Sequence, residues 1–177
     1  MLLLVGAVIE MYRDLLQLRD NAGMLDVPQS IDLGEFKGRL ADIPGLPIGL
    51  TTQPSAVVLF LSNRCGTCRS LANSLSGRHP EGLWIVVENS VATPNDYTTN
   101  YDLDLSRTIV DVDNAIAEQL RISLTPLAIT IRNGRFLDAT SVPSTRRLTE
   151  LMDVALYGRA APDKTSRMIP SQFKLKE

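Results

Sequence analysis

The stretch AVVLFLSNRCGTCRSLANSL, residues 56–75, decides the fold because its hydrophobic pattern changes period halfway along. Residues 56–61 are apolar without interruption and rich in β-branched side chains, which predicts a central strand buried on both faces. Beyond this run the apolar side chains recur at helical spacing, at Cys68, Leu71, Ala72 and Leu75. The sequence therefore predicts a strand followed directly by a helix, with Cys65 at the junction.

The segments after this one alternate between strand and helix patterns. They are, in order, a buried strand at 83–88, a short strand and an Asp-capped helix within 108–120, a hairpin at 127–140 and an amphipathic helix at 144–156. The hairpin is predicted by Asn133-Gly134, the strongest short hairpin signal. Crossover connections followed by a hairpin predict an α/β sandwich with a mixed central sheet flanked by helices.

The chain has 177 residues, which suits one domain with extensions. We expect a domain over 26–158, an N-terminal apolar or amphipathic helix over 1–25 and a C-terminal tail over 159–177. The chain begins with nine apolar residues, MLLLVGAVI, whereas a membrane span needs about 20. Three interpretations stay open: the remnant of a transmembrane anchor, an amphipathic helix that contacts a membrane or partner through residues 1–20, or a helix packed on its own domain.

Composition and charge argue against several classes of partner and ligand. A net charge of −2 without a basic run argues against nucleic acid. Two cysteines and one histidine fall short of the four ligands of a structural zinc site, and the Arg-His-Pro context of His79 indicates a surface turn. We expect no metal and no cofactor. The calcium-loop pattern is also missing from the acidic residues of the later loops, which we interpret as helix caps and solvated positions: Asp102, Asp104, Asp111 and Asp113.

The position of Cys65 at a strand–helix junction favours thiol chemistry. Free N–H groups and the positive end of the helix dipole stabilise an anion there, and the thiolate is the nucleophile of disulfide exchange. Arg64 and Arg69 add positive charge, with no acidic residue close in sequence. Cys68 lies one turn later on the same helix face, so Cys65 is predicted to attack and Cys68 to resolve. The alternative is a pair of small buried apolar side chains.

Two stretches carry a resemblance to a known family. VVLFLSNRCGTCRSL is similar to the active-site strand, loop and helix of the thioredoxin superfamily, and VDVDNAIAEQLRISLTPLAITIRNGR is similar to its later helix, X-Pro and strand. The resemblance covers roughly residues 54–157. The membrane-tethered TlpA-like proteins and the MauD-like proteins of methylamine utilisation are most similar, because they share an apolar N-terminal segment, a linker with short strands and an insertion before the third strand.

The resemblance implies a thioredoxin-like three-layer sandwich with a redox-active Cys65–Cys68 pair. It also implies that Pro126 is cis and lies beside the cysteines, so that Thr125 presents its backbone to an extended client. The residues expected to contact that client are Arg64, Gly66, Thr67, Thr125 and Pro126.

The sequence departs from the thioredoxin pattern at two positions. Arg64 stands where a tryptophan often precedes the first cysteine. Leu59 stands where thioredoxin has the buried acid that assists proton transfer, and a leucine cannot take a proton. Glu88 on the next strand is a distant candidate for that acid, but we interpret it as a surface carboxylate at a strand end.

Two hypotheses of function follow. The first is a protein thiol–disulfide oxidoreductase, membrane-associated with an extracytoplasmic redox domain. It would act on a client protein, exchange electrons with an upstream redox protein, and serve maturation of a cofactor-containing enzyme. The second is a non-catalytic thioredoxin-like binding or assembly module. A peroxide-reducing enzyme is a weaker third option, because FLSNRC lacks the expected Thr/Pro-rich loop.

Overall fold

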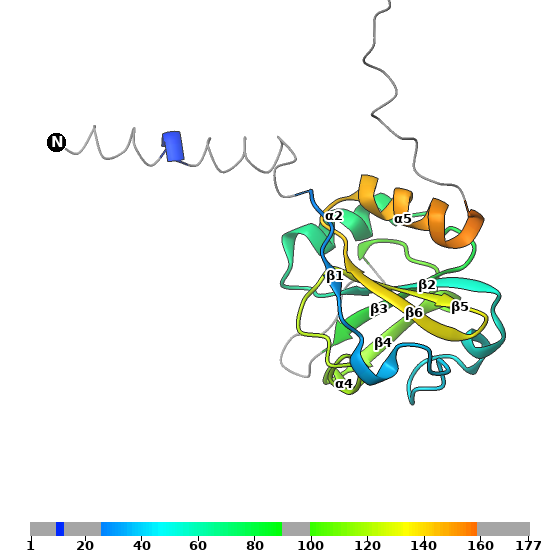
Figure 1. Cartoon of the computed structure of the whole chain (residues 1–177). Coiled ribbons are helices and arrows are strands. Elements are labelled where there is room, and N and C mark those ends of the chain that lie inside the picture. The colour runs from blue at the N-terminus through cyan, green and yellow to red at the C-terminus, as the bar shows by residue number, and fades with distance from the viewer. Residues whose placement is uncertain (1–9, 13–25, 90–99, 159–177) are drawn as a thin grey trace, which may run out of the picture.

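The computed structural model describes residues 10–12, 26–89 and 100–158 (Figure 1). Residues 10–12 are helical. The strands are β1 Ser30–Ile31, β2 Ser55–Leu61, β3 Leu83–Asn89, β4 Thr108–Val112, β5 Leu127–Arg132 and β6 Arg135–Ser141. The helices are α2 Gly66–Leu75, α4 Ala115–Gln119 and α5 Thr145–Tyr157, with 3₁₀ turns η1 Gly34–Phe36, η2 Ile48–Thr52 and η3 Leu105–Arg107.

The six strands form one mixed sheet in the order β1-β6-β5-β2-β3-β4. Strands β2, β3 and β4 run parallel, whereas β5 pairs antiparallel with both β2 and β6. Helices α2 and α5 cover one face of the sheet and α4 lies against the other (Figure 1). This architecture confirms the predicted three-layer α/β sandwich, which is thioredoxin-like, with β2 at its centre.

The predicted hairpin forms, and its turn is fixed by its surroundings. Asn133 and Gly134 both have positive φ, 50° and 71°. A side chain at Gly134 would place its Cβ 1.8 Å from the carbonyl oxygen of Thr51, so only glycine fits. The amides of Asn133 and Gly134 donate to the carbonyls of Pro54 and Gln53, which joins the turn to the segment before β2.

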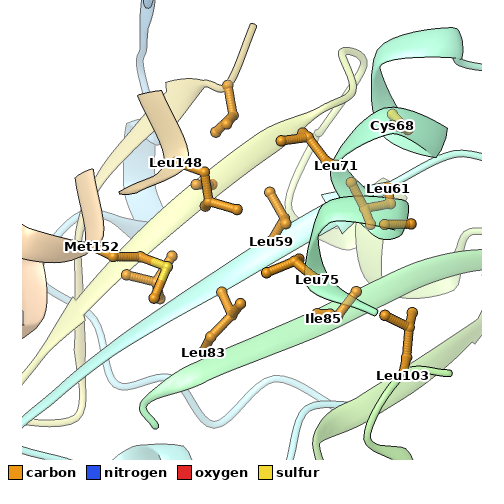
Figure 2. Packing of buried hydrophobic residues seen from close by; sticks show 14 of the residues in the cluster. Leu59, Leu61, Cys68, Leu71, Leu75, Leu83, Ile85, Leu103, Leu148 and Met152 are labelled. Carbon is orange, nitrogen blue, oxygen red and sulfur yellow. The ribbon is translucent and has the colours of Figure 1, made fainter. Parts of the chain in front are cut away.

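Two apolar clusters fill the space on either side of the sheet. The first lies under α2 and α5 and contains Leu59 of β2. Figure 2 shows Leu59 between Leu71 and Leu75 of α2 and Leu148 and Met152 of α5. The second cluster lies on the α4 side and contains Phe60 of β2. Because successive β2 residues point to opposite faces, one continuous apolar strand supplies both cores.

Residues 26–55 are more than the expected linker with short strands. β1 does form an edge strand, which pairs antiparallel with β6. The rest of the segment adds five buried side chains to the second cluster, so it is part of the domain core: Leu33, Phe36, Ala41, Ile43 and Leu50. Two of these side chains, Phe36 and Leu50, are carried inward by 3₁₀ turns in this segment rich in Pro and Gly.

Several expectations fall outside the described residues. The helix expected over 1–25 is described only at 10–12, and the tail from 159 onward not at all. Residues 90–99, between β3 and η3, also lie outside the described residues. Among the described residues no helix is both long and apolar enough to span a membrane. The boundaries at residues 25 and 158 and the membrane contact through residues 1–20 stay predictions.

Candidate functional site

Cys65 is the N-cap residue of α2, as the change of period predicts. Its backbone is extended, with φ −94° and ψ 121°, and its Sγ accepts the amide of Cys68 at 3.3 Å. The side chain of Cys65 is partly exposed, and both cysteines are free thiols. A sulfur at this position faces the free amides of the first helical turn, which are the groups that stabilise a thiolate.

Cys68 lies behind Cys65 and is fully buried. Figure 2 shows it on the same helix as Leu71, in the apolar cluster under α2. Burial raises the pKa of the Cys68 thiol to about 12, and its hydrogen bond with Cys65 acts in the same direction. Cys65 is therefore the thiol that an external sulfur can reach, whereas Cys68 can react only through Cys65.

Thr125 and Pro126 lie next to the cysteines, although they are about sixty residues later in the chain. The Cys65 thiol donates to the Thr125 carbonyl at 3.7 Å. The Thr125–Pro126 peptide bond is cis, which confirms that expectation. The Pro126 carbonyl accepts the amide of Val142 at 2.9 Å, so the segment before β5 is tied to the end of β6.

The five residues expected to contact a client fall into two neighbouring clefts. Gly66, Thr67 and Pro126 line a cleft of about 1000 Å³ between α2, the segment before β5 and the start of α5. Arg64 and Thr125 line another cleft of about 420 Å³ on the α4 side of the sheet. A side chain added at Gly66 would meet nothing within 4 Å, so the first cleft opens directly beside the cysteines.

Glu88 is the residue that sequence reasoning placed wrongly. Its side chain is only 17% exposed, and it lies in the 420 Å³ cleft beside the cysteine loop rather than at the surface. The Ser62 hydroxyl donates to Glu88 Oε2, and Arg64 Nη2 lies 3.6 Å from Glu88 Oε1. No acidic residue is close to Arg64 in sequence, but β3 brings one to it from 24 residues away.

The register of the sheet could have revealed Glu88. Leu61 pairs with Val87 in the parallel β2–β3 ladder, so Ser62, which follows β2, comes to lie beside Glu88, the next residue of β3. A carboxylate near the end of a buried strand, adjacent to the strand that leads into the cysteines, is the signal. Glu88 faces the α4 side of the sheet, whereas Leu59 faces α2, so Glu88 does not occupy the position of the thioredoxin acid.

Leu59 is fully buried in the first apolar cluster, with no exposed surface. This position therefore offers no proton donor or acceptor on the α2 side of β2. Asp111 of β4 is also buried, but its two carboxylate oxygens accept the amides of Ile116 and Ala117 at 2.8 and 3.0 Å. The N-cap residue of α4 is Asn114, which makes no side-chain cap bond, so the aspartate that serves the first turn of this helix does so from the preceding strand.

His79 is half-buried rather than on a surface turn. Its Nε2 lies 3.0 Å from the Leu83 carbonyl, and burial lowers the pKa of its imidazole. It lies beyond the C-terminal end of α2, away from the N-terminal end that holds Cys65. Within the part of the chain that the structure describes, no group of three or more His, Cys, Asp or Glu side chains is placed to hold a metal ion.

The sequence matches no family model and no curated protein. Among solved structures, a hypothetical protein from Sinorhizobium meliloti 1021 is similar with a TM-score of 0.51 and 18% identity, over 76% of this chain and 90% of that one. A thiol-disulfide isomerase from Corynebacterium glutamicum has a TM-score of 0.45 and 17% identity, over 71% and 96%. A secreted Mycobacterium tuberculosis disulfide oxidoreductase has a TM-score of 0.40 and 20% identity, over 51% and 72%. At these identities the likeness concerns the fold.

Proposed function

We propose that this protein is a thiol–disulfide oxidoreductase that acts on a protein client through Cys65 and Cys68. The observation that supports this most strongly is the pairing of a partly exposed thiol at a helix amino terminus with a buried thiol one turn behind it. A reactive cysteine needs access and a stabilised thiolate, whereas a resolving cysteine needs only to reach the first.

In the reducing direction, the Cys65 thiolate attacks one sulfur of a client disulfide. A Cys65–client disulfide forms, and the second client sulfur leaves as a thiolate that takes a proton from solvent. Cys68 then loses its proton and attacks the Cys65 sulfur, which releases the first client sulfur as a second thiol. The client gains two electrons and two protons, and the protein is left with a Cys65–Cys68 disulfide. The oxidising direction is the reverse of these steps, and an upstream redox protein restores the starting form.

The two clefts beside Cys65 support a role for their lining residues in holding the client. Gly66 leaves room for a client backbone beside the sulfur, and Thr67 and Pro126 line the same cleft. Arg64 and Thr125 line the cleft on the other side. We assign these five residues to client contact, with extended client backbone running past Thr125.

The finer assignments rest on the N-terminal sequence and on the family resemblance. The apolar run MLLLVGAVI and the resemblance to TlpA-like and MauD-like proteins favour membrane association with the redox domain on the extracytoplasmic side. By the same resemblance, the client belongs to the maturation of a cofactor-containing enzyme. Fractionation of cells that express the full chain, with protease added from outside, would test this location.

The reaction can be tested by removing the resolving thiol. With Cys68→Ala, oxidised glutathione should leave one glutathione attached to Cys65, because nothing remains to displace it. The unchanged protein should instead end with an internal disulfide and no lasting adduct. Cys65→Ser is the matched control and should form neither product. Mass spectrometry of intact and digested protein distinguishes these species.

One observation favours the second candidate, a non-catalytic binding module: the buried β2 residue that faces α2 is Leu59, which cannot assist Cys68 as an acid. If the unchanged protein keeps glutathione on Cys65 and never forms an internal disulfide, the oxidoreductase proposal is wrong. The two clefts would then serve binding alone.

A further inference from the structure

Glu88 lies at the point where the strand after the cysteine helix meets the loop that precedes Cys65. It belongs to β3, and the loop of Ser62, Asn63 and Arg64 follows directly from β2. The chain separates Glu88 from this loop by more than twenty residues, and the parallel β2–β3 pairing brings them together. Glu88 thus contacts the cysteine loop without being part of it.

The contacts of Glu88 hold this loop at two points. One carboxylate oxygen accepts the hydroxyl of Ser62, and that same hydroxyl oxygen accepts the backbone amide of Arg64 at 3.3 Å. The other carboxylate oxygen lies 3.6 Å from the Arg64 guanidinium. The Ser62 carbonyl also accepts the amide of Cys65 at 3.3 Å. Glu88 therefore contacts the guanidinium of Arg64 directly and its backbone amide through the Ser62 hydroxyl. Arg64 is the residue that directly precedes the attacking cysteine.

The charges in this cleft come from three elements besides β3. Arg64 comes from the cysteine loop, Asp111 from β4 and Glu118 from α4. Both oxygens of Asp111 are engaged by amides of α4, and Glu118 is exposed on that helix. Glu88 is thus the carboxylate of this cleft that contacts Arg64 directly, and it is largely shielded from solvent.

We propose that Glu88 is a positioning residue for the Cys65 thiolate. Glu88 pairs with Arg64 and so weakens the effect of the arginine's positive charge on Cys65. The arrangement offsets the cation that the sequence places beside the nucleophile. It makes the thiolate less favourable, relative to both the thiol and the disulfide, than it would be in a site with an unopposed arginine. This inference rests on the proposed function, but its test needs only the reactivity of one thiol.

The test is the rate at which iodoacetamide alkylates Cys65 at pH 6, followed by mass spectrometry in the folded full-length protein. Glu88→Gln removes the negative charge and releases Arg64, so alkylation should become about two- to five-fold faster, as expected for a partly exposed ion pair. Arg64→Gln should make it slower by a similar factor. In the doubly substituted protein the effect of Glu88→Gln should fall below about two-fold, because there is no arginine left to release.

Glu118→Gln is the matched control, because it removes the same charge from the same cleft without a contact to Arg64. It should change the rate by less than about 1.5-fold. The positioning role would be overturned if Glu88→Gln changed the alkylation rate by the same factor with and without Arg64. It would also be overturned if Glu118→Gln changed that rate as much as Glu88→Gln does. Thermal unfolding of each variant separates these results from misfolding.

A second measurement links the Glu88 and Arg64 variants to redox chemistry. Two glutathione thiols reduce the Cys65–Cys68 disulfide to two thiols and become one glutathione disulfide, so electrons and protons balance. Glu88→Gln should shift this equilibrium constant toward the dithiol by about two- to five-fold. If the unchanged protein forms no internal disulfide, the proposed function is wrong. The alkylation rates of the single and double variants still decide the role of Glu88.

Discussion

Helices α2 and α5 cover the same face of the sheet, and each begins with a side chain that accepts the amide three positions later. The cap is Cys65 Sγ in α2 and Ser144 Oγ in α5, and both distances are 3.3 Å. Their surroundings differ. Ser144 also donates to the Asp26 carboxylate at 2.6 Å, and Arg146 forms an ion pair with the same carboxylate. Cys65, by contrast, donates from its thiol to the Thr125 carbonyl, at a long 3.7 Å.

This difference is what we expect between a structural cap and the cap that we propose is reactive. The serine is held by a charged network, so it has little freedom to leave the helix end. The sulfur makes two weak contacts, because sulfur is a poor donor and a poor acceptor. Cys65 can therefore exchange its capping role for a bond to another sulfur at small cost, and the helix amides remain to stabilise the thiolate whenever that bond breaks.

The largest expected effect comes from making the two caps alike. Cys65→Ser should abolish the internal disulfide completely, because the attacking atom is gone. The free energy of unfolding of the reduced protein should change by less than about 1 kcal/mol, since serine is a preferred N-cap. Urea unfolding and intact-protein mass measure the two quantities. A loss of several kcal/mol would mean that Cys65 is a structural residue of the core.

A second prediction concerns the buried partner of Cys65. The Cys68 thiol has an ordinary pKa of 9.0, which burial raises to about 12. Above pH 9 the unfolded chain therefore binds fewer protons than the folded one. The stabilisation is complete below pH 9 and is lost as pH rises, by up to about 1.4 kcal/mol per pH unit. Urea unfolding of the reduced protein from pH 8 to 10.5 would measure this decrease.

Cys68→Ala is the matched control for that pH series, because it removes the titrating thiol and leaves an apolar side chain in its place. Its free energy of unfolding should decrease less steeply above pH 9. If both proteins lose stability at the same rate, other groups cause the decrease, and Cys68 is not held as a buried thiol.

The smallest effect is expected at the structural cap. Ser144→Ala should lower the free energy of unfolding by about 1 kcal/mol, because it leaves an amide of the first turn of α5 without its acceptor. Ser123→Ala, at an exposed position, should change it by less than about 0.5 kcal/mol. Equal effects of the two changes would show that the Asp26 network holds the start of α5 without the serine.

The elements around Cys65 could be predicted from the sequence because local patterns determine them. An unbroken apolar strand, a helix with one apolar face and an Asn-Gly turn each need only a few neighbouring residues to be recognised. The segment at 26–55 was predicted less well, because its buried side chains follow no period. Phe36 and Leu50, for example, become core residues through 3₁₀ turns that only the tertiary structure explains.

The candidate site divides in the same way. The cysteine pair could be predicted from its position at a strand–helix junction, and the cis Pro126 from the family resemblance. The contact between Glu88 and Arg64 was missed because it depends on strand register, and a shift of one residue would have turned Glu88 to the α2 side. Local sequence thus indicated the candidate reactive atoms, whereas the charge that surrounds them came from pairing between strands.

The central claim is that Cys65 and Cys68 form a reversible two-electron couple. The most direct measurement equilibrates the reduced protein with glutathione buffers of increasing oxidation and counts its free thiols by mass after acid quenching. We predict a single transition from two free thiols to none, reversible on returning to reducing buffer, with no lasting one-thiol species. Two free thiols at every ratio, or a glutathione adduct that persists on Cys65, would contradict the account.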